Sequence, residues 1–208
     1  MENKAYFITG IGTDVGKTVV SSIFAQALHA HYWKPVQAGD LDFSDTMKVQ
    51  ANCSDDVKFM PEKYRLKTAA SPHLAAQLDG IKIQLSDFQL PDVDTNLLIE
   101  GAGGLFVPLN DAGLLYIDLI QQFNLPIILV SRHYLGSINH TLLTLEALKN
   151  RGLHVEVLVF VGDENAATEQ AILQQYPIQK VIRIPLVESI TKAFVQEQAM
   201  RVRSLLVD

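Results

Sequence analysis

The sequence predicts an α/β fold in which a doubly wound, mostly parallel sheet carries helices on both faces. Short apolar runs rich in β-branched and aromatic residues alternate along the 208 residues with longer segments of helical period. The strand-like runs are apolar at nearly every position, as in strands that are buried on both faces. Right-handed crossovers between such strands produce the doubly wound arrangement. A chain of this length favours one domain, so we expect residues 1–208 to form a single unit.

The first half of the chain alternates in this way up to one irregular stretch. Its strands and helices are expected, in order, as a strand at Ala5–Thr9, a helix at Lys17–His31, a strand at Trp33–Val36, a helix at Pro72–Gln77 and a strand at Asn96–Ile99. The stretch Gln37–Ala70 holds polar and acidic residues with little periodicity, which indicates a long loop. Loops of that length are uncommon in compact domains and tend to be functional.

The second half alternates more regularly, because each strand-like run is followed closely by a helical segment. The expected elements are helices at Leu114–Phe123, Ser137–Arg151, Ala166–Gln175 and from Ile190 onward, with strands at Pro126–Ser131, Val155–Val161 and Lys180–Ile184. In such sheets ligands bind beyond the carboxyl ends of the strands, so we expect functional residues at those ends.

Composition excludes several classes of protein. Apolar residues make up 48% and charged residues 19% of the chain, and the net charge is -6. We expect no nucleic-acid partner, because a binder that follows phosphates carries a basic stripe. We expect no membrane association, because apolar runs such as Leu125–Val130 are far shorter than the ~20 residues of a membrane span. The start has no signal-peptide layout, and Cys53 is the single cysteine, so we expect a cytoplasmic protein.

The first strand-like run leads into a phosphate-binding pattern. Gly10–Thr18 reads Gly-Ile-Gly-Thr-Asp-Val-Gly-Lys-Thr and precedes a helix, which is the context that a P-loop requires. Backbone N–H groups and the helix N-terminus would surround the phosphates. Lys17 would reach the β- and γ-phosphates, and the Thr18 hydroxyl would bind Mg²⁺. A strict Walker A motif has glycine where Ile11 stands, so the glycine at position 10 lies one residue early.

A second functional pattern follows the third strand. Glu100 ends a buried-type strand and precedes Gly101-Ala102-Gly103-Gly104. P-loop proteins keep the acidic residue that orients Mg²⁺ at such a strand end, where Asp is more frequent than Glu. The alternative is an ordinary glycine turn after a strand. Asp40, Asp42 and Asp45 follow the second strand, and the first two are typical of a solvated loop.

Several phrases together resemble one family, the ATP-dependent dethiobiotin synthetases of the P-loop NTPase superfamily. These phrases are Thr9–Thr18, Lys34-Pro35-Val36-Gln37-Ala38-Gly39, Ser44-Asp45, Ser71-Pro72-His73, Glu100–Gly104 and Leu135–His140. They occur in the family's order from residue 6 to about residue 140. The additional residue in the P-loop is normal for this family. The resemblance implies a ligase of biotin biosynthesis.

The resemblance implies the following reaction. One amine of 7,8-diaminononanoate takes up CO₂ to form a carbamate, whose oxygen attacks the γ-phosphate of ATP. The second amine then attacks the resulting carbamic–phosphoric anhydride and closes the ring, which yields dethiobiotin, ADP and phosphate. The protein mainly has to position these groups and offset their negative charge. Family members act as homodimers with the active site at the subunit interface.

The resemblance also assigns residues to roles. Lys34 would hold the carbamate and Lys17 the transferring phosphoryl group, while Thr18, Asp45 and Glu100 would bind Mg²⁺ through oxygen atoms. The other nucleotide-binding residues would be Asp14, Val15, Gly16, Val19, Gly101, Ala102, Gly103, Gly162, Pro185, Leu186 and Val187. The diamine would meet Thr13, Ala38 and the turn Gly101–Gly103 in the same subunit, and its carboxylate would meet Gly136, Ser137, Ile138 and Asn139 of the neighbouring one. An exposed strand-end lysine and an ordinary helix cap are the alternatives for Lys34 and for the Gly136–Asn139 turn.

Two positions depart from the family pattern. Ala38 stands where members usually have Ser or Thr against the substrate, so one hydroxyl contact is absent. Val161 precedes Gly162 where an Asn that recognises the base is usual, which predicts loose nucleotide preference. The histidines show no metal-like spacing, and His73 has no assigned role.

Three other classes of protein share parts of these patterns. A non-catalytic switch of the partitioning-ATPase type shares the fold, but its signature lysine would fall at Gly12. A switch of the GTPase type would need an Asn-Lys-x-Asp phrase, which does not occur. Amide-forming synthetases, the second class, usually carry a glutaminase domain with a nucleophilic cysteine, for which this chain has neither the length nor the cysteine context. A structural subunit with a degenerate site is the third alternative, favoured only by Ala38 and Val161.

Overall fold

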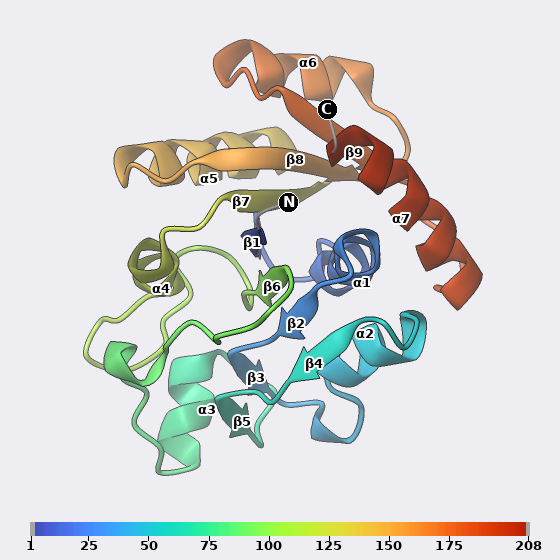
Figure 1. The fold of residues 1–208 in the computed structure, drawn as a ribbon. Coiled ribbons are helices and arrows are strands. Elements are labelled where there is room, and N and C mark those ends of the chain that lie inside the picture. Colours follow the sequence, from blue (N-terminus) through green and yellow to red (C-terminus); the bar gives the residue numbers. More distant parts are fainter. Residues whose placement is uncertain (1–2, 207–208) are drawn as a thin grey trace.

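A seven-stranded sheet with parallel pairing throughout forms the centre of the molecule (Figure 1). The computed structural model of the protein describes residues 3–206. The strand order is β4-β2-β6-β1-β7-β8-β9. The bounds are β1 Ala5–Gly10, β2 His31–Trp33, β4 Lys58–Met60, β6 Leu97–Glu100, β7 Ile127–Arg132, β8 Val155–Val161 and β9 Lys180–Ile184. β1 lies between β6 and β7, so the P-loop that follows it lies near the middle of the sheet edge.

Helices cover both faces of this sheet, which confirms the predicted doubly wound architecture (Figure 1). One face carries α1 (Lys17–Leu28), α2 (Asp45–Asn52) and α7 (Lys192–Leu206). The other carries α4 (Tyr116–Phe123), α5 (Ser137–Asn150) and α6 (Ala166–Gln175). A small sheet of β3 (Val36–Ala38) and β5 (Tyr64–Leu66) packs with α3 (Pro72–Leu78) beside the main sheet. Single 3₁₀ turns lie at Leu41–Phe43 and Leu85–Asp87.

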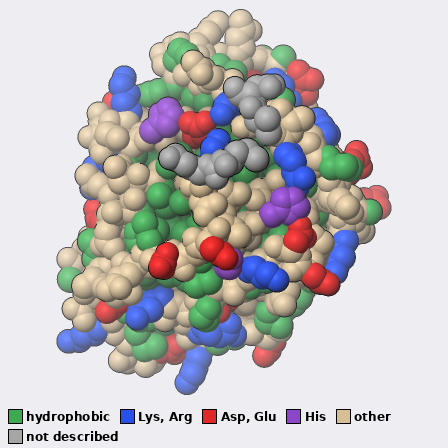
Figure 2. Space-filling view, viewed as in Figure 1, with side chains coloured by type: hydrophobic (Ala, Val, Ile, Leu, Met, Phe, Trp, Pro, Cys, Tyr) green, Lys and Arg blue, Asp and Glu red, His purple; other side chains and the backbone are tan. Residues whose placement is uncertain are grey.

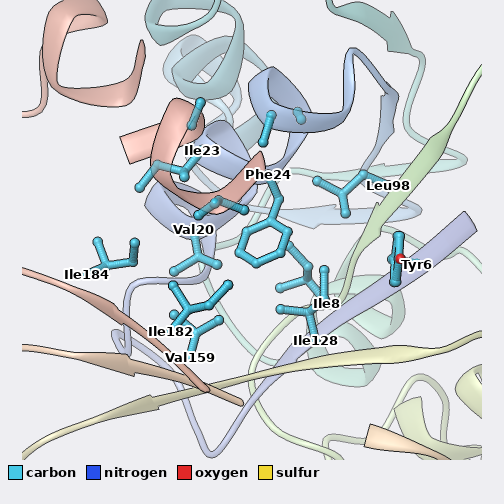
Figure 3. Close-up of a cluster of buried hydrophobic side chains, with 14 of the residues drawn as sticks. Tyr6, Ile8, Val20, Ile23, Phe24, Leu98, Ile128, Val159, Ile182 and Ile184 are labelled. Carbon is cyan, nitrogen blue, oxygen red and sulfur yellow. The ribbon is translucent and has the colours of Figure 1, made fainter. Parts of the chain in front are cut away.

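The apolar core beneath α1 holds the start of this helix against the sheet. Figure 3 shows Val20, Ile23 and Phe24 of α1 meeting strand side chains that include Ile8 and Ile128. All five of these side chains are fully buried. Burying large apolar side chains contributes about 1.5–3 kcal/mol each. The P-loop is therefore fixed at both ends by a well-packed strand and helix.

Two elements in the first half of the chain have bounds that differ from those predicted from the sequence. Trp33–Val36 is not one strand, because β2 ends at Trp33 and β3 begins at Val36. Pro35 has no N–H for a sheet ladder, and the residue before a proline is conformationally restricted. The helix predicted to reach His31 ends at Leu28, where His29 adopts a left-handed conformation with φ of 48°. The chain then has room to enter β2 at His31.

The predicted irregular loop at Gln37–Ala70 is also wrong. This stretch contains β3, α2, β4 and β5. Each of these strands has three residues, which is too short to show a period of two. The start of α2 did carry a local signal, because the Ser44 side chain caps the helix by accepting a hydrogen bond from the Met47 N–H.

The surface in the view of Figure 2 interleaves acidic and basic side chains with apolar ones. None of the helices in residues 3–206 combines the length and apolarity of a membrane-spanning helix. Cys53 is buried, and its thiol donates to the Ser22 carbonyl at 3.3 Å. Burial raises the pKa of this thiol to about 12, as for an inert core residue.

Candidate active site

A phosphate-binding loop joins β1 to α1 at the carboxyl edge of the sheet. Gly16 caps α1 with φ of 95°, a left-handed conformation that suits glycine. A Cβ atom on Gly10 would lie 2.6 Å from Val15 Cγ2, so the loop closes over a glycine at that position. This contact gives a structural reason for the glycine at position 10. The first N–H groups of α1 have no side-chain cap, which leaves them available to phosphate oxygens.

Lys17 folds over this loop. Its Nζ donates to the Gly12 carbonyl at 2.7 Å, and the side chain is largely buried. Burial, together with the nearby Lys34 charge, lowers the pKa of Lys17 to about 8. A poorly solvated ammonium group at the start of a helix would gain much from a bound phosphate.

Glu100 is the fully buried carboxylate beside the P-loop. It ends β6, which is paired with β1, and the register places it opposite Ile8. Its Oε1 accepts hydrogen bonds from Thr18 Oγ1 at 3.2 Å and from Lys34 Nζ at 2.9 Å. Its Oε2 accepts a third from the Tyr32 hydroxyl at 2.9 Å. The P-loop and the strand end at Glu100 therefore meet at one carboxylate, although Thr18 and Glu100 are 82 positions apart in the sequence.

Lys34 lies in the break between β2 and β3, and the lysine is buried rather than exposed. Only 3% of its side chain is accessible. Besides Glu100, its Nζ contacts the Gly101 carbonyl at 3.0 Å and Asp45 Oδ2 at 2.8 Å. Burial alone would disfavour the ammonium form, but the carboxylates of Glu100 and Asp45 outweigh it and raise the pKa of Lys34. Lys34 is therefore a permanent, oriented cation.

Asp45 brings the segment after β3 to the same point. It is the first residue of α2, and its backbone N–H donates to Gln37 Oε1 at 3.2 Å. Its side chain is 22% exposed, and Lys48 Nζ lies 3.5 Å from Oδ1. Burial opposes ionisation of this carboxyl, but Lys34 and then Lys48 lower its pKa below the ordinary value.

These groups line one open cleft of about 740 Å³. The predicted site residues on its wall are Thr13, Asp14, Gly16, Lys17, Thr18, Val19, Lys34, Ala38, Asp45, Glu100, Ala102 and Gly103. Two predicted residues support the wall from behind. Val15 is buried under the loop, and Gly101 bonds the Ile8 carbonyl through its N–H at 2.9 Å.

The cleft also contains residues that sequence reasoning missed. Lys48, one turn after Asp45 on α2, adds a cation at the mouth of the cleft and pairs with Asp40 at 3.6 Å. Ala69–Pro72 form part of the wall, and the Ser71-Pro72 phrase was a signal for them. Tyr32 bonds Glu100 from the interior, and no local pattern marked it.

A second, smaller cavity of about 180 Å³ adjoins the P-loop on its other side. Pro185, Leu186 and Val187 line it with Val161, so the structure joins the predicted base-side loop to the start of α1. Gly162 is not on its wall, but its N–H bonds the Ile184 carbonyl at 3.0 Å and ties the ends of β8 and β9 together. Arg132 was missed by sequence reasoning; it lines this cavity, and its Nη1 donates to the Asp14 carbonyl at 3.2 Å.

The turn before α5 lies apart from both cavities. Gly136 caps α5 with φ of 103°, and Ser137 is buried. Ile138 and Asn139 are exposed, as is the preceding Leu135. None of Gly136–Asn139 lines either cavity of this chain. The structure therefore does not bring these four predicted substrate residues to the cleft within one subunit.

The predicted Mg²⁺ ligands fit a hard cation in the chemistry of their donors. Thr18 Oγ1 and Glu100 Oε1 lie 3.2 Å apart, and Asp45 and Glu100 contact the same ammonium nitrogen. All three supply oxygen atoms, which Mg²⁺ prefers. Within residues 3–206 no cluster of three or more His, Cys, Asp or Glu side chains is arranged to hold a metal ion. The set of one hydroxyl and two carboxylates suits a cation that also carries water and phosphate ligands.

The sequence is similar to those of known proteins over most of its length. A family model described as "AAA domain" matches residues 4–193. The chain is 51% identical to the ATP-dependent dethiobiotin synthetase BioD of Christiangramia forsetii, with 99% of each chain covered. It is 48% identical to the protein of the same name from Cytophaga hutchinsonii, over 95% of this chain and 96% of that one.

Two solved structures share the fold at low identity. A putative plasmid partition protein from Borrelia burgdorferi B31, bound to AMPPNP, is similar with a TM-score of 0.62 and 11% identity over 100% of this chain and 99% of that one. A ParA family ATPase from Chlorobium tepidum TLS gives 0.53 and 14%, over 99% and 91%. At this level of identity the likeness concerns the fold alone.

Proposed function

This chain belongs to the family of ATP-dependent dethiobiotin synthetases, and we propose that the cleft at the P-loop is its active site. The protein is therefore an ATP-dependent cyclo-ligase of biotin biosynthesis. The observation that carries this assignment is the position of Lys34, a buried cation between the P-loop, Glu100 and Asp45. A non-catalytic nucleotide switch is not favoured. The partitioning ATPases share only the fold at 11–14% identity, whereas the relatives at 48–51% are dethiobiotin synthetases.

Lys17 and Lys34 would each offset the negative charge of a different reacting group. Lys17, in the P-loop, would contact the γ-phosphate, and Lys34 would contact the carbamate formed from CO₂ and one amine of 7,8-diaminononanoate. The carbamate oxygen forms a bond to the γ-phosphorus while the bond to ADP breaks. The second amine then attacks the carbamoyl carbon, loses a proton and expels phosphate as the ring closes. Two cations reduce the repulsion between carbamate and triphosphate.

The other walls of the cleft would position the diamine and the nucleotide. Thr13, Ala38, Ala102 and Gly103 line the cleft and would contact the diamine chain, with Gly101 behind them in the same turn. The apolar cavity at Pro185–Val187 would take the base. Val161 at that cavity offers only methyl groups to a base. Loose discrimination between nucleotides is therefore part of the proposal.

Mg²⁺ is the metal that these residues would hold, through Thr18, Asp45 and Glu100. When bound, it would neutralise part of the triphosphate charge. Glu100 is fixed by its three hydrogen bonds, whereas Asp45 is partly exposed at the start of a helix. Lys34 bonds both carboxylates, so it would restrain them near the phosphates.

We further propose that the protein works as a homodimer in the cytoplasm. The turn Gly136–Asn139 lies outside the cleft of its own chain, and apolar Tyr134, Leu135, Ile138 and Leu143 are exposed around it. A second subunit that covers this surface would bring the uncapped helix start to the carboxylate of the diamine. Consumption of ATP and the presence of a single cysteine suit a cytoplasmic location.

The reaction is tested by following phosphate release from MgATP with bicarbonate, with and without 7,8-diaminononanoate. Release that depends on the diamine, together with a cyclic urea product, is the expected result. Release that ignores the diamine would contradict the proposed active site.

The shared site is tested by mixing two inactive variants, Lys34→Met and Asn139→Asp, after dissociation and reassociation. Each mixed dimer then contains one intact site, so roughly a quarter of the wild-type activity should return. No recovery, in a mixture that light scattering shows to be dimeric, would contradict the shared site.

A further inference from the structure

The two oxygens of Glu100 face different surroundings. Oε1 is contacted by Thr18 and Lys34, on the side of the P-loop and the cleft. Oε2 is contacted by the hydroxyl of Tyr32 at 2.9 Å, and both residues are completely buried. One oxygen therefore faces the groups around the phosphates, and the other is bonded to the protein interior.

The sheet explains how Tyr32 reaches this carboxylate. β2 runs parallel to β6, with Tyr32 in register with Leu98. Side chains two residues apart lie on the same face of a strand, so Tyr32, Leu98 and Glu100 share the face covered by α1. Two residues along a strand advance about 6.6 Å, which a tyrosine ring can span. The ring of Phe59 lies 6.1 Å from the Tyr32 ring, centroid to centroid, and restricts its orientation.

We propose that Tyr32 is a positioning residue that reserves Oε1 of Glu100 for the nucleotide's metal ion, an inference that rests on the proposed function. Because Oε2 is held by the phenol, the carboxylate cannot rotate to present both oxygens to one cation. The phenol is neutral and leaves the full negative charge of Glu100 in place. Hydrogen bonds that orient a metal-binding carboxylate in this way commonly change metal affinity 10–100-fold.

The test is the substitution Tyr32→Phe, which removes one hydroxyl and keeps the ring. Binding of Mn²⁺, as a stand-in for Mg²⁺, is measured by electron paramagnetic resonance with a non-hydrolysable ATP analogue present. We expect Mn²⁺ binding about tenfold weaker than in the wild type. Nucleotide binding in excess EDTA should change less than twofold. Incorporation of 4-aminophenylalanine at position 32, which restores an N–H donor, should recover most of the affinity.

Tyr6→Phe is the matched control, because Tyr6 is also buried in the cluster under α1 and contributes to no hydrogen bond of Glu100. The proposal is overturned if Tyr32→Phe binds Mn²⁺ within twofold of the wild type, or if Tyr6→Phe weakens binding equally. Wild-type protein that binds no Mn²⁺ with nucleotide would instead overturn the metal site itself.

A second measurement keeps the test open if Tyr32→Phe does not fold. 3-Fluorotyrosine at position 32 retains the hydroxyl, and its ¹⁹F resonance reports the carboxylate beside it. Addition of Mg²⁺ to the nucleotide-bound protein should shift this resonance, whereas fluorotyrosine at position 6 should not respond. An unchanged resonance at position 32 would overturn the proposal.

Discussion

The two cavities beside the P-loop differ in size and in chemistry. The phosphate end is made by Lys17, Thr18, Lys34, Asp45 and Glu100, and all of these except Lys17 are joined to one another by hydrogen bonds or ion pairs. The base end, made by Arg132, Val161 and Pro185–Val187, is mostly apolar, and Leu186 and Val187 are exposed. The phosphate end is a network of bonded polar groups, whereas the base end is a small, mostly apolar cavity.

This difference indicates where the binding energy and the specificity lie. Buried charges that are held by several partners act strongly and tolerate little change, because removal of one leaves the others unpaired. Apolar contacts with a planar base are weaker and do not distinguish one base from another, since discrimination requires hydrogen bonds to base edges. Substitutions should therefore have large effects at the phosphate end and small ones at the base end.

Lys34→Met should have the largest effect. It removes the buried cation while keeping its volume, and we expect turnover about a thousandfold lower with intact nucleotide binding. It also leaves the buried carboxylate of Glu100 without the cation that pairs with it, so the protein should lose about 3 kcal/mol of unfolding free energy. Initial rates and thermal unfolding check both effects. Lys58→Met, an exposed lysine on β4, is the control. Turnover within a few-fold of wild type would show that Lys34 does not clamp the carbamate.

Thr18→Val should have the second largest effect, a loss of Mg²⁺-nucleotide affinity. The substitution is close to isosteric, but it removes the hydroxyl that bonds Glu100 and would bind Mg²⁺. We expect Mg²⁺-nucleotide affinity about tenfold weaker by calorimetry, or about 1.4 kcal/mol, and little change in EDTA. Thr144→Val on α5, where the hydroxyl bonds only its own helix, is the control. Unchanged affinity in Mg²⁺ would contradict the assigned P-loop geometry.

Val161→Asn should raise the selectivity of the base end, because it gives this end an amide group that can form hydrogen bonds with a base. We expect the preference for ATP over CTP and GTP, measured as kcat/KM ratios, to rise about threefold to tenfold. The wild type should show ratios within about tenfold of one another. Val161→Thr adds a polar atom with little change in volume and serves as the control. A wild type that already selects ATP by a thousandfold would contradict the apolar interpretation of this cavity.

Leu186→Ala should have the smallest effect. Leu186 is 52% exposed at the rim of the base cavity, so its removal costs only part of one apolar contact. We expect KM for ATP to rise about twofold to threefold with kcat unchanged. Progress curves over a range of ATP concentrations separate the two constants. A fall in kcat would mean that this loop takes part in more than base binding.

The alternation of strands and helices was predictable because runs such as Val155–Val161 and Ala166–Gln175 are long enough to show their period. The structure of the segment after β3 was not predictable, because it consists of three-residue strands and one short helix whose positions depend on packing. The break at Lys34-Pro35 was misread for a related reason. Apolar neighbours on both sides continue the pattern of a strand, and only the sheet shows that β2 and β3 pair with different partners.

The sequence by itself determined the phosphate-binding loop, because its residues are consecutive and a strand, glycine turn and helix can form that geometry locally. It also determined the family, through phrases whose order does not depend on the fold. Only the tertiary structure decided that Lys34 is buried between Glu100 and Asp45, and that Tyr32 holds the far oxygen of Glu100. Those contacts join residues up to 68 positions apart. The two contacts with Glu100 exist because the sheet places β2 beside β6, an arrangement that the buried core selects and no local pattern encodes.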